Sequence, residues 1–170
     1  MADVAETGGP SAVDQTGNLT IWAIAGRTIS QSSPSAALLG GSSCFRITYS
    51  FTTAGWALTA PQALLADERL TSVQDRQSLG KVTPAIADLV YVDSTVAGSA
   101  AVVLATGGLF QFIERRNVAQ TVLAASAQKV RVINVNLGVQ APGPTDGTGK
   151  FTYTQVAAVD SLGAVVALAV

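Results

Sequence analysis

Three stretches of the chain alternate apolar and polar residues with a period of two, and this pattern limits the fold more than any other feature. They are residues 45–52, 130–137 and 151–156. Successive side chains of a strand point to opposite faces, so such alternation is typical of a strand with one face in a core. The residues of the first stretch that we expect to face the core are Phe45, Ile47, Tyr49 and Phe51.

Further elements are predicted between these stretches. Short helices are expected over 34–39, after a possible cap at Ser33, and over 99–106, ended by Gly107 and Gly108. β-Branched and aromatic residues favour more strands, over 19–25, 85–92, 109–114 and 164–170. The sequence predicts a mainly β fold: a small β-sandwich or barrel with one or two short helices and a long loop.

The length of 170 residues fits one domain. Residues 1–17 lack a periodic apolar pattern, so we expect a mobile N-terminal arm followed by a single domain over 18–170. The arm has neither a basic start nor an apolar run, which argues against a secretory signal and makes folding in the cytoplasm the default. Residues 94–113 carry no charge, but their glycines and polar residues argue against a membrane span.

The long loop is predicted over residues 61–80, which hold many of the charges and show little periodicity. Long loops in compact domains are usually functional or disordered, and in an assembling subunit a contact with a neighbour is the expected function. A solvated excursion is the alternative. The candidate contact residues in and beside it are Asp67, Glu68, Arg69, Leu70 and Arg76.

The low charge of the chain favours a subunit of an assembly over a solitary domain. Charged residues make up 12% of the sequence and the mean hydropathy is +0.39, so a lone copy would expose apolar patches that normally mark interfaces. The net charge of −1 argues against tight binding to nucleic acid.

Several classes of site are disfavoured by the residue inventory. The sequence has no His and a single cysteine, Cys44, so zinc clusters, Cys/His pairs and an imidazole base are not expected, and neither a catalytic site nor a cofactor is predicted. Adjacent acids Asp67 and Glu68 are read as solvated rather than as paired acids or metal ligands. Residues 143–150 resemble a phosphate-binding loop only superficially, because a strand pattern follows where a helix is required.

Arg115 and Arg116 form the only adjacent basic pair, at the end of a predicted strand. They could form salt bridges across a subunit boundary or face DNA phosphates, and an ordinary exposed strand end is an equal alternative. We retain both arginines as candidate inter-subunit contacts.

Taken in order, the elements over 19–170 resemble the tail tube protein family of long, non-contractile-tailed bacteriophages. The pieces that carry the resemblance are Leu19-Thr20-Ile21-Trp22-Ala23, the 34–41 helix, the 44–51 strand, Asp67-Glu68-Arg69-Leu70, Gly80, Leu89-Val90-Tyr91-Val92, the helix ending in Gly107-Gly108, Arg115-Arg116 before 124–130, residues 132–140, a Pro-rich turn, and Thr154-Gln155 before a closing strand. The match lies in the order of these pieces, and the acidic content around Gly107 and after Pro142 is lower than the family pattern.

The resemblance implies a structural virion protein whose six-membered rings stack into the tail tube, the conduit for DNA ejection. Implied partners are further copies, the tape measure, tail terminator and distal tail proteins, and phage DNA that passes without specific binding. No membrane partner and no enzymatic activity are implied. The expected location is the virion tail, after assembly in the host bacterial cytoplasm.

Two alternatives remain open at the level of the sequence. A tail terminator, connector or capsid decoration protein would share a small β fold and low charge. A carbohydrate-binding β-sandwich would need Trp22, Trp56 and Tyr153 exposed along a shallow site, although Trp22 within a strand is better read as a core residue.

Overall fold

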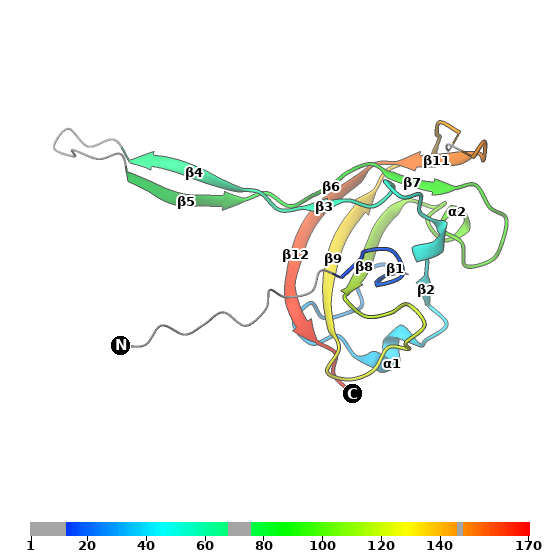
Figure 1. The fold of residues 1–170 in the computed structure, drawn as a ribbon, viewed down its shortest axis with the longest axis horizontal. Helices are drawn as coiled ribbons and strands as arrows, with labels where there is room; N and C mark the ends of the chain where they lie inside the picture. The colour runs from blue at the N-terminus through cyan, green and yellow to red at the C-terminus, as the bar shows by residue number, and fades with distance from the viewer. Residues whose placement is uncertain (1–12, 68–75, 146–147) are drawn as a thin grey trace.

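The computed structural model describes residues 13–67, 76–145 and 148–170. Its main layer is a five-stranded antiparallel sheet in the order β12-β9-β8-β1-β2 (Figure 1). β-Branched and aromatic residues are frequent in the central strands β1, β8 and β9, as their propensities favour. The strands are β1 (Leu19–Ala25), β2 (Cys44–Arg46), β8 (Gly108–Arg116), β9 (Lys129–Leu137) and β12 (Ala157–Ala167).

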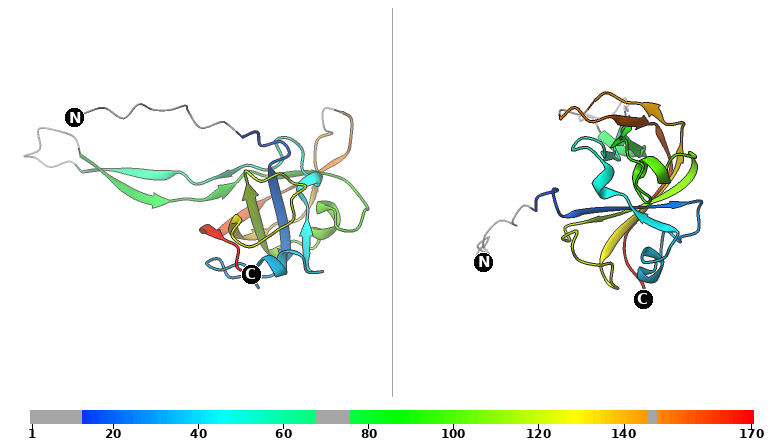
Figure 2. Two further views of the ribbon diagram at one scale, coloured as in Figure 1. Left: turned by 60° about the horizontal axis from the view of Figure 1, so that its bottom comes forward. Right: turned by 90° about the vertical axis from the view of Figure 1, so that its right-hand side faces the viewer.

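Smaller elements close the structure around this sheet (Figure 2). A second sheet has the order β10-β11-β7, and β3 pairs with β6. The strands are β10 (Ala141–Pro142), β11 (Thr152–Gln155), β7 (Leu89–Val92), β3 (Leu58–Thr59) and β6 (Ala85–Ile86). Two one-turn helices, α1 (Ala36–Leu39) and α2 (Ala100–Val103), and a 3₁₀ turn over Thr48–Ser50 complete this region. We call the main sheet together with these smaller elements the body.

Each face of the main sheet covers a core. On the first face Phe112 and Ile133 pack with Trp56 and Tyr91, and the rings of Trp56 and Phe112 meet edge to face with centroids 5.2 Å apart. The second face carries a smaller core that includes Trp22, Ile113, Val132, Leu39 and Leu168. The body is therefore held by apolar packing on both sides of one sheet.

A long hairpin leaves the body beside β3 and β6. It consists of β4 (Gln62–Asp67) and β5 (Arg76–Val82), which pair only with each other in the described residues. Figures 1 and 2 show it projecting well beyond the body. The prediction of a long loop over 61–80 is therefore corrected, because residues 62–67 and 76–80 are strands.

The mainly β fold with two short helices is confirmed. The prediction that residues 45–52 form one half-buried strand is wrong, because the chain leaves the edge strand β2 after Arg46 and enters the 3₁₀ turn. Phe45 and Tyr49 are consequently exposed, whereas Ile47 is buried and Phe51 half-buried. The predicted 85–92 strand is two strands, β6 and β7, and the last strand begins earlier than predicted, at Ala157.

Most of the predicted N-terminal arm lies outside the described residues. Its last part, residues 13–17, is exposed or half-buried and leads into β1. The division into an arm over 1–17 and one domain over 18–170 stays a prediction.

Candidate assembly interface

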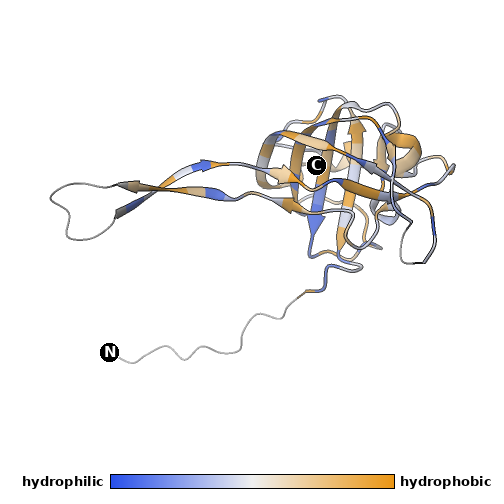
Figure 3. Ribbon diagram, turned by 90° about the horizontal axis from the view of Figure 1, so that it is seen from above, coloured by the Kyte–Doolittle hydropathy of each residue, from blue (hydrophilic) through white to orange (hydrophobic). Residues whose placement is uncertain are grey.

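The β4–β5 hairpin exposes large apolar side chains without a described partner to cover them. Leu64 is 62% exposed, Leu65 54% and Leu79 71%. Figure 3 shows apolar colour along the hairpin outside the body. An isolated two-stranded hairpin is at best marginally stable in water, so a surface of this kind is typical of an interface.

The exposed leucines lie on both faces of the hairpin. Leu64 is opposite Leu79 in the register, and Leu65 is opposite Ser78. Since neighbouring residues of a strand point to opposite faces, Leu64 and Leu79 share one face and Leu65 lies on the other. Gly80 leaves space beside Leu65, because a Cβ on Gly80 would come within 3.1 Å of the Leu65 side chain. The hairpin can therefore contact apolar surface on both of its sides.

Two of the candidate contact residues of the sequence, Asp67 and Arg76, lie where the described strands of this hairpin end. Asp67 is the last residue of β4 and lies opposite Arg76, the first residue of β5. Glu68, Arg69 and Leu70 lie outside the described residues. Their role as inter-subunit contacts stays a prediction, and the exposed Leu64, Leu65 and Leu79 were not among the residues predicted.

Arg115 lies in the body and is fully buried. Its guanidinium stacks over the ring of Trp22, 5.2 Å from the centroid. It donates hydrogen bonds to the Gln128 side chain at 2.7 Å and to the carbonyl of Val122 at 2.8 Å. Further acceptors are the Thr20 hydroxyl and the carbonyls of Ala119 and Leu123. Arg115 thus fixes the segment 117–128 on the second face of the sheet and offers no surface of its own to another copy.

The electrostatics of Arg115 are unusual because no described carboxylate pairs with it. Burial lowers the pKa of its guanidinium, and the nearby charge of Arg46 lowers it further. The carbonyl oxygens around it replace the hydration that burial removes.

Arg116, the second member of the pair, has a side chain that is 58% exposed. Its Nη2 donates to the carboxylate of Glu114 at 2.8 Å, and the indole Nε1 of Trp56 donates to the same oxygen at 3.1 Å. Glu114 is buried, so this ion pair and hydrogen bond satisfy a charge that would otherwise be costly. The remaining exposed part of Arg116 is available for a contact outside the chain.

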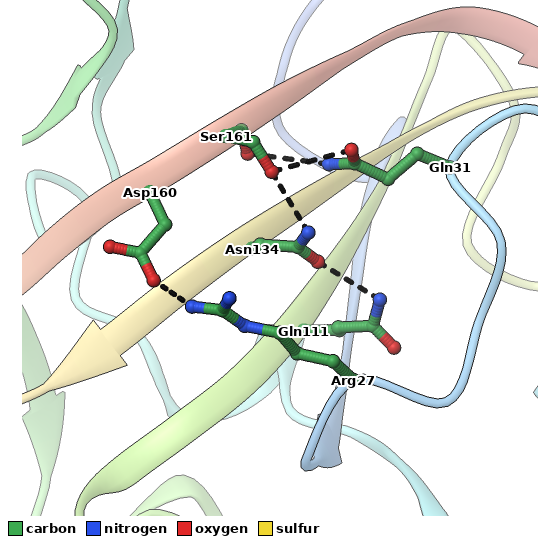
Figure 4. A network of polar contacts seen from close by, with 6 residues as sticks. All are labelled: Arg27, Gln31, Gln111, Asn134, Asp160 and Ser161. Atoms are coloured by element: carbon green, nitrogen blue, oxygen red, sulfur yellow. Dashed lines mark hydrogen bonds and ion pairs between the residues drawn. The ribbon is translucent and has the colours of Figure 1, made fainter.

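A network of polar side chains fixes the loop after β1 against the sheet (Figure 4). The Gln111 amide donates to Asn134 at 2.9 Å, and Asn134 donates to the hydroxyl of Ser161 at 2.8 Å. Gln31 donates to the backbone carbonyl of Ser161, and Arg27 forms an ion pair with Asp160. The network links β8, β9 and β12 to the loop, so its role is to support the second face.

The described residues do not form the other sites that were considered from the sequence. The glycine-rich residues 143–145 and 148–150 lead into strand β11, not a helix. Trp22 and Trp56 are buried, so they do not form a carbohydrate platform with the half-buried Tyr153. Cys44 is half-buried, and burial raises the pKa of its thiol to about 12. Within residues 13–67, 76–145 and 148–170 there is no group of side chains suited to hold a metal ion.

A search for membrane-spanning helices among the described residues finds none of sufficient length and hydrophobicity. The short helix predicted within 94–113 is α2, and it is followed by strand β8.

One known protein family matches this chain. A family model described as phage tail tube protein matches residues 8–170. A search of curated proteins finds no match. The matched family is structural rather than a class of enzymes, and it implies a component of the virion tail that oligomerises into a tube. Because the match spans nearly the whole chain, this protein belongs to the phage tail tube protein family.

Proposed function

We propose that this chain assembles into stacked six-membered rings that form the tail tube of a long, non-contractile-tailed phage and conduct DNA into the host. The observation that carries the proposal is the β4–β5 hairpin, which projects from the body with leucines exposed on both faces. The family gives the class of assembly, and the hairpin gives an element through which copies can associate.

Contact with another copy would remove the apolar side chains of the hairpin from water. Full burial of one leucine stabilises an association by about 1.5–3 kcal/mol. Leu64, Leu65 and Leu79 are each more than half exposed in the single chain, so a contact that covers all three can contribute about twice that amount. A head-to-tail contact between different surfaces closes into a ring or continues as a stack, according to its rotation.

The proposed conduit needs no specific contact with DNA. The chain has 10 basic and 11 acidic residues, and a wall that is neutral to acidic would not bind phosphates strongly. Passage of DNA is then passive guidance without chemistry. The tape measure, tail terminator and distal tail proteins are proposed as partners that set the length and ends of the tube.

Negative-stain electron microscopy of the purified protein at high concentration, with its mass in solution, tests the proposal. Hollow tubes or stacked rings with six-fold symmetry are the expected result. Persistent monomers, even after addition of a tail initiator complex, would contradict it and favour a decoration protein.

A further inference from the structure

A pocket of about 430 Å³ lies where β8 ends and β9 begins. In β8, Glu114 and Arg116 share the face of Phe112, because side chains two residues apart point the same way. In β9, Arg131 is opposite Glu114 in the register, so Arg131 and Lys129 lie on that face too. The pocket therefore continues the first face of the sheet beyond its core, and its volume is within the range of about 300–1,000 Å³ that is usual for ligand sites.

Positive charge predominates in this pocket. Three cations line it, Arg116, Lys129 and Arg131, against one carboxylate, Glu114. That carboxylate is already engaged, because one of its oxygens accepts from both Trp56 and Arg116. Among the described residues, Lys129 and Arg131 take part in no ion pair, although Arg131 lies opposite Glu114. Two cations are thus available to a negatively charged group from outside the chain.

Aliphatic side chains line the pocket beside these cations. Val165 in β12 lies opposite Arg131 in β9 and is 53% exposed. Val118 and Val130 belong to the lining as well. A strongly hydrated inorganic anion would leave these valines in contact with water, whereas a carboxylate on an aliphatic chain pairs with the cations and also covers the valines. The lining therefore favours a ligand with both groups.

Contacts on the other face of the sheet fix the frame of the pocket. Arg115 points to the second face, where it donates to the carbonyls of Ala119 and Val122. These hydrogen bonds hold the residues that follow Asn117, whose φ of 59° turns the chain away from β8. Val118 thereby keeps its place at the pocket. A ligand meets a wall that is already ordered, which lowers the cost of binding.

We propose that this pocket binds an aliphatic carboxylate. The carboxylate accepts hydrogen bonds from the guanidinium of Arg131 and the ammonium of Lys129, and the aliphatic chain packs against Val165 and Val118. The group that is recognised is the same in a free small acid and in a glutamate side chain of a partner protein. The site belongs to the single chain and goes beyond the proposed function.

An NMR titration of the isotope-labelled full chain, below the concentration at which it assembles, tests the site with glutarate as the probe. Saturable shifts of the amide signals of residues 114–118, 129–131 and 165 are expected, with a Kd of about 1 mM or lower. Glutaramide has the same carbon chain without charge and is expected to bind at least about tenfold more weakly. Absence of saturable shifts in these segments, or equal binding of glutaramide, would overturn the proposal.

Two substitutions assign the binding to the named cations. Lys129→Gln and Arg131→Gln each remove one charge, and each is expected to weaken the binding of glutarate by about fivefold or more. Lys81→Gln is the matched control, because Lys81 is an exposed lysine of β5 outside the pocket, and its Kd should not change. Lys129 is itself exposed, so its substitution leaves the fold intact even if that of Arg131 does not. Unchanged binding in the Lys129 variant would overturn the proposal.

Two further ligands distinguish the source of the carboxylate. The capped tripeptide acetyl-Val-Glu-Val-amide carries the group on a side chain, and tighter binding of this peptide than of glutarate would assign the site to a partner protein. Tighter binding of glutarate would assign it to a free acid, and both results support the proposal. Inorganic phosphate that binds as tightly as either ligand would contradict recognition of an aliphatic carboxylate. Because binding is measured on the unassembled chain, its failure is distinct from failure of the proposed function.

Discussion

The body and the hairpin are built from similar residues but place them in opposite environments. Phe112 and Ile133 in the body have no exposed surface, whereas Leu64 and Leu79 in the hairpin are mostly exposed. Both regions have regular antiparallel pairing. Burial in the body stabilises the single chain, and we propose that the hairpin becomes buried only when copies associate. The comparison therefore separates residues that determine folding from residues that we propose determine assembly.

The largest effect on stability is expected in the core of the body. Phe112→Ala removes a fully buried ring that packs edge to face on Trp56. We expect the free energy of unfolding to fall by about 3–5 kcal/mol, because a cavity remains. Urea denaturation followed by tryptophan fluorescence measures it. A loss below about 1 kcal/mol would contradict the account of the core.

A smaller but still large effect is expected at Arg115. Arg115→Met keeps much of the length of the side chain but removes the donors that hold the segment 117–128. We expect a loss of about 2–4 kcal/mol in the free energy of unfolding, because several buried carbonyls lose a charged donor.

Arg27→Met is the matched control, because the side chains of Arg27 and of its ion-pair partner Asp160 are 39% and 42% exposed. Its expected cost is about 1 kcal/mol or less. The same denaturation experiment compares the two variants. Equal losses would show that burial does not distinguish the two arginines and would break the comparison between them.

The reactivity of cysteine thiols compares the body with the hairpin, and we expect the substitutions involved to change the free energy of unfolding only slightly. The raised pKa of Cys44 leaves very little thiolate at pH 8 in the folded chain. Since the unfolded thiol ionises at lower pH than the folded one, any contribution of Cys44 to stability is present below pH 9 and declines as the pH rises toward 12.

The exposed counterpart is a cysteine at Leu79, made as Leu79→Cys in a Cys44→Ala background. In the unassembled protein we expect it to react with a thiol reagent at least about 100-fold faster than Cys44 at pH 8. After assembly its rate should decrease strongly as the hairpin becomes covered. An unchanged rate in assembled protein would contradict a buried hairpin.

Much of the body could be predicted from the sequence because burial on one face leaves a period of two. Residues 130–137 follow it in two parts, because Val130 and Val132 lie in the core of the second face and Ile133, Val135 and Leu137 in that of the first, and β9 spans Lys129–Leu137. The pattern failed at Phe45 and Tyr49, because it reports alternation but not where an edge strand ends. The two helices were signalled by their flanking residues, although the cap of α1 is Ser35 rather than Ser33.

The hairpin could not be recognised in the same way. Its adjacent residues Leu64 and Leu65 point to opposite faces, so a strand that exposes both faces has no alternation to detect. The burial of Arg115 was also missed, since two adjacent arginines look like an exposed strand end. A usable signal was present in β8, where Ile113 and Arg115 share a face, and Ile113 belongs to the core of the second face.

We propose that the exposed leucines of the hairpin serve assembly and not folding, and the double variant Leu64→Ser with Leu79→Ser allows both properties to be measured on one chain. Its free energy of unfolding and its sedimentation into tubes are measured beside those of the unsubstituted protein. The account predicts stability within about 0.5 kcal/mol of the unsubstituted chain, as for exposed positions, together with loss of tubes. Normal tubes from the double variant would contradict the claim, and so would a large loss of stability in the single chain.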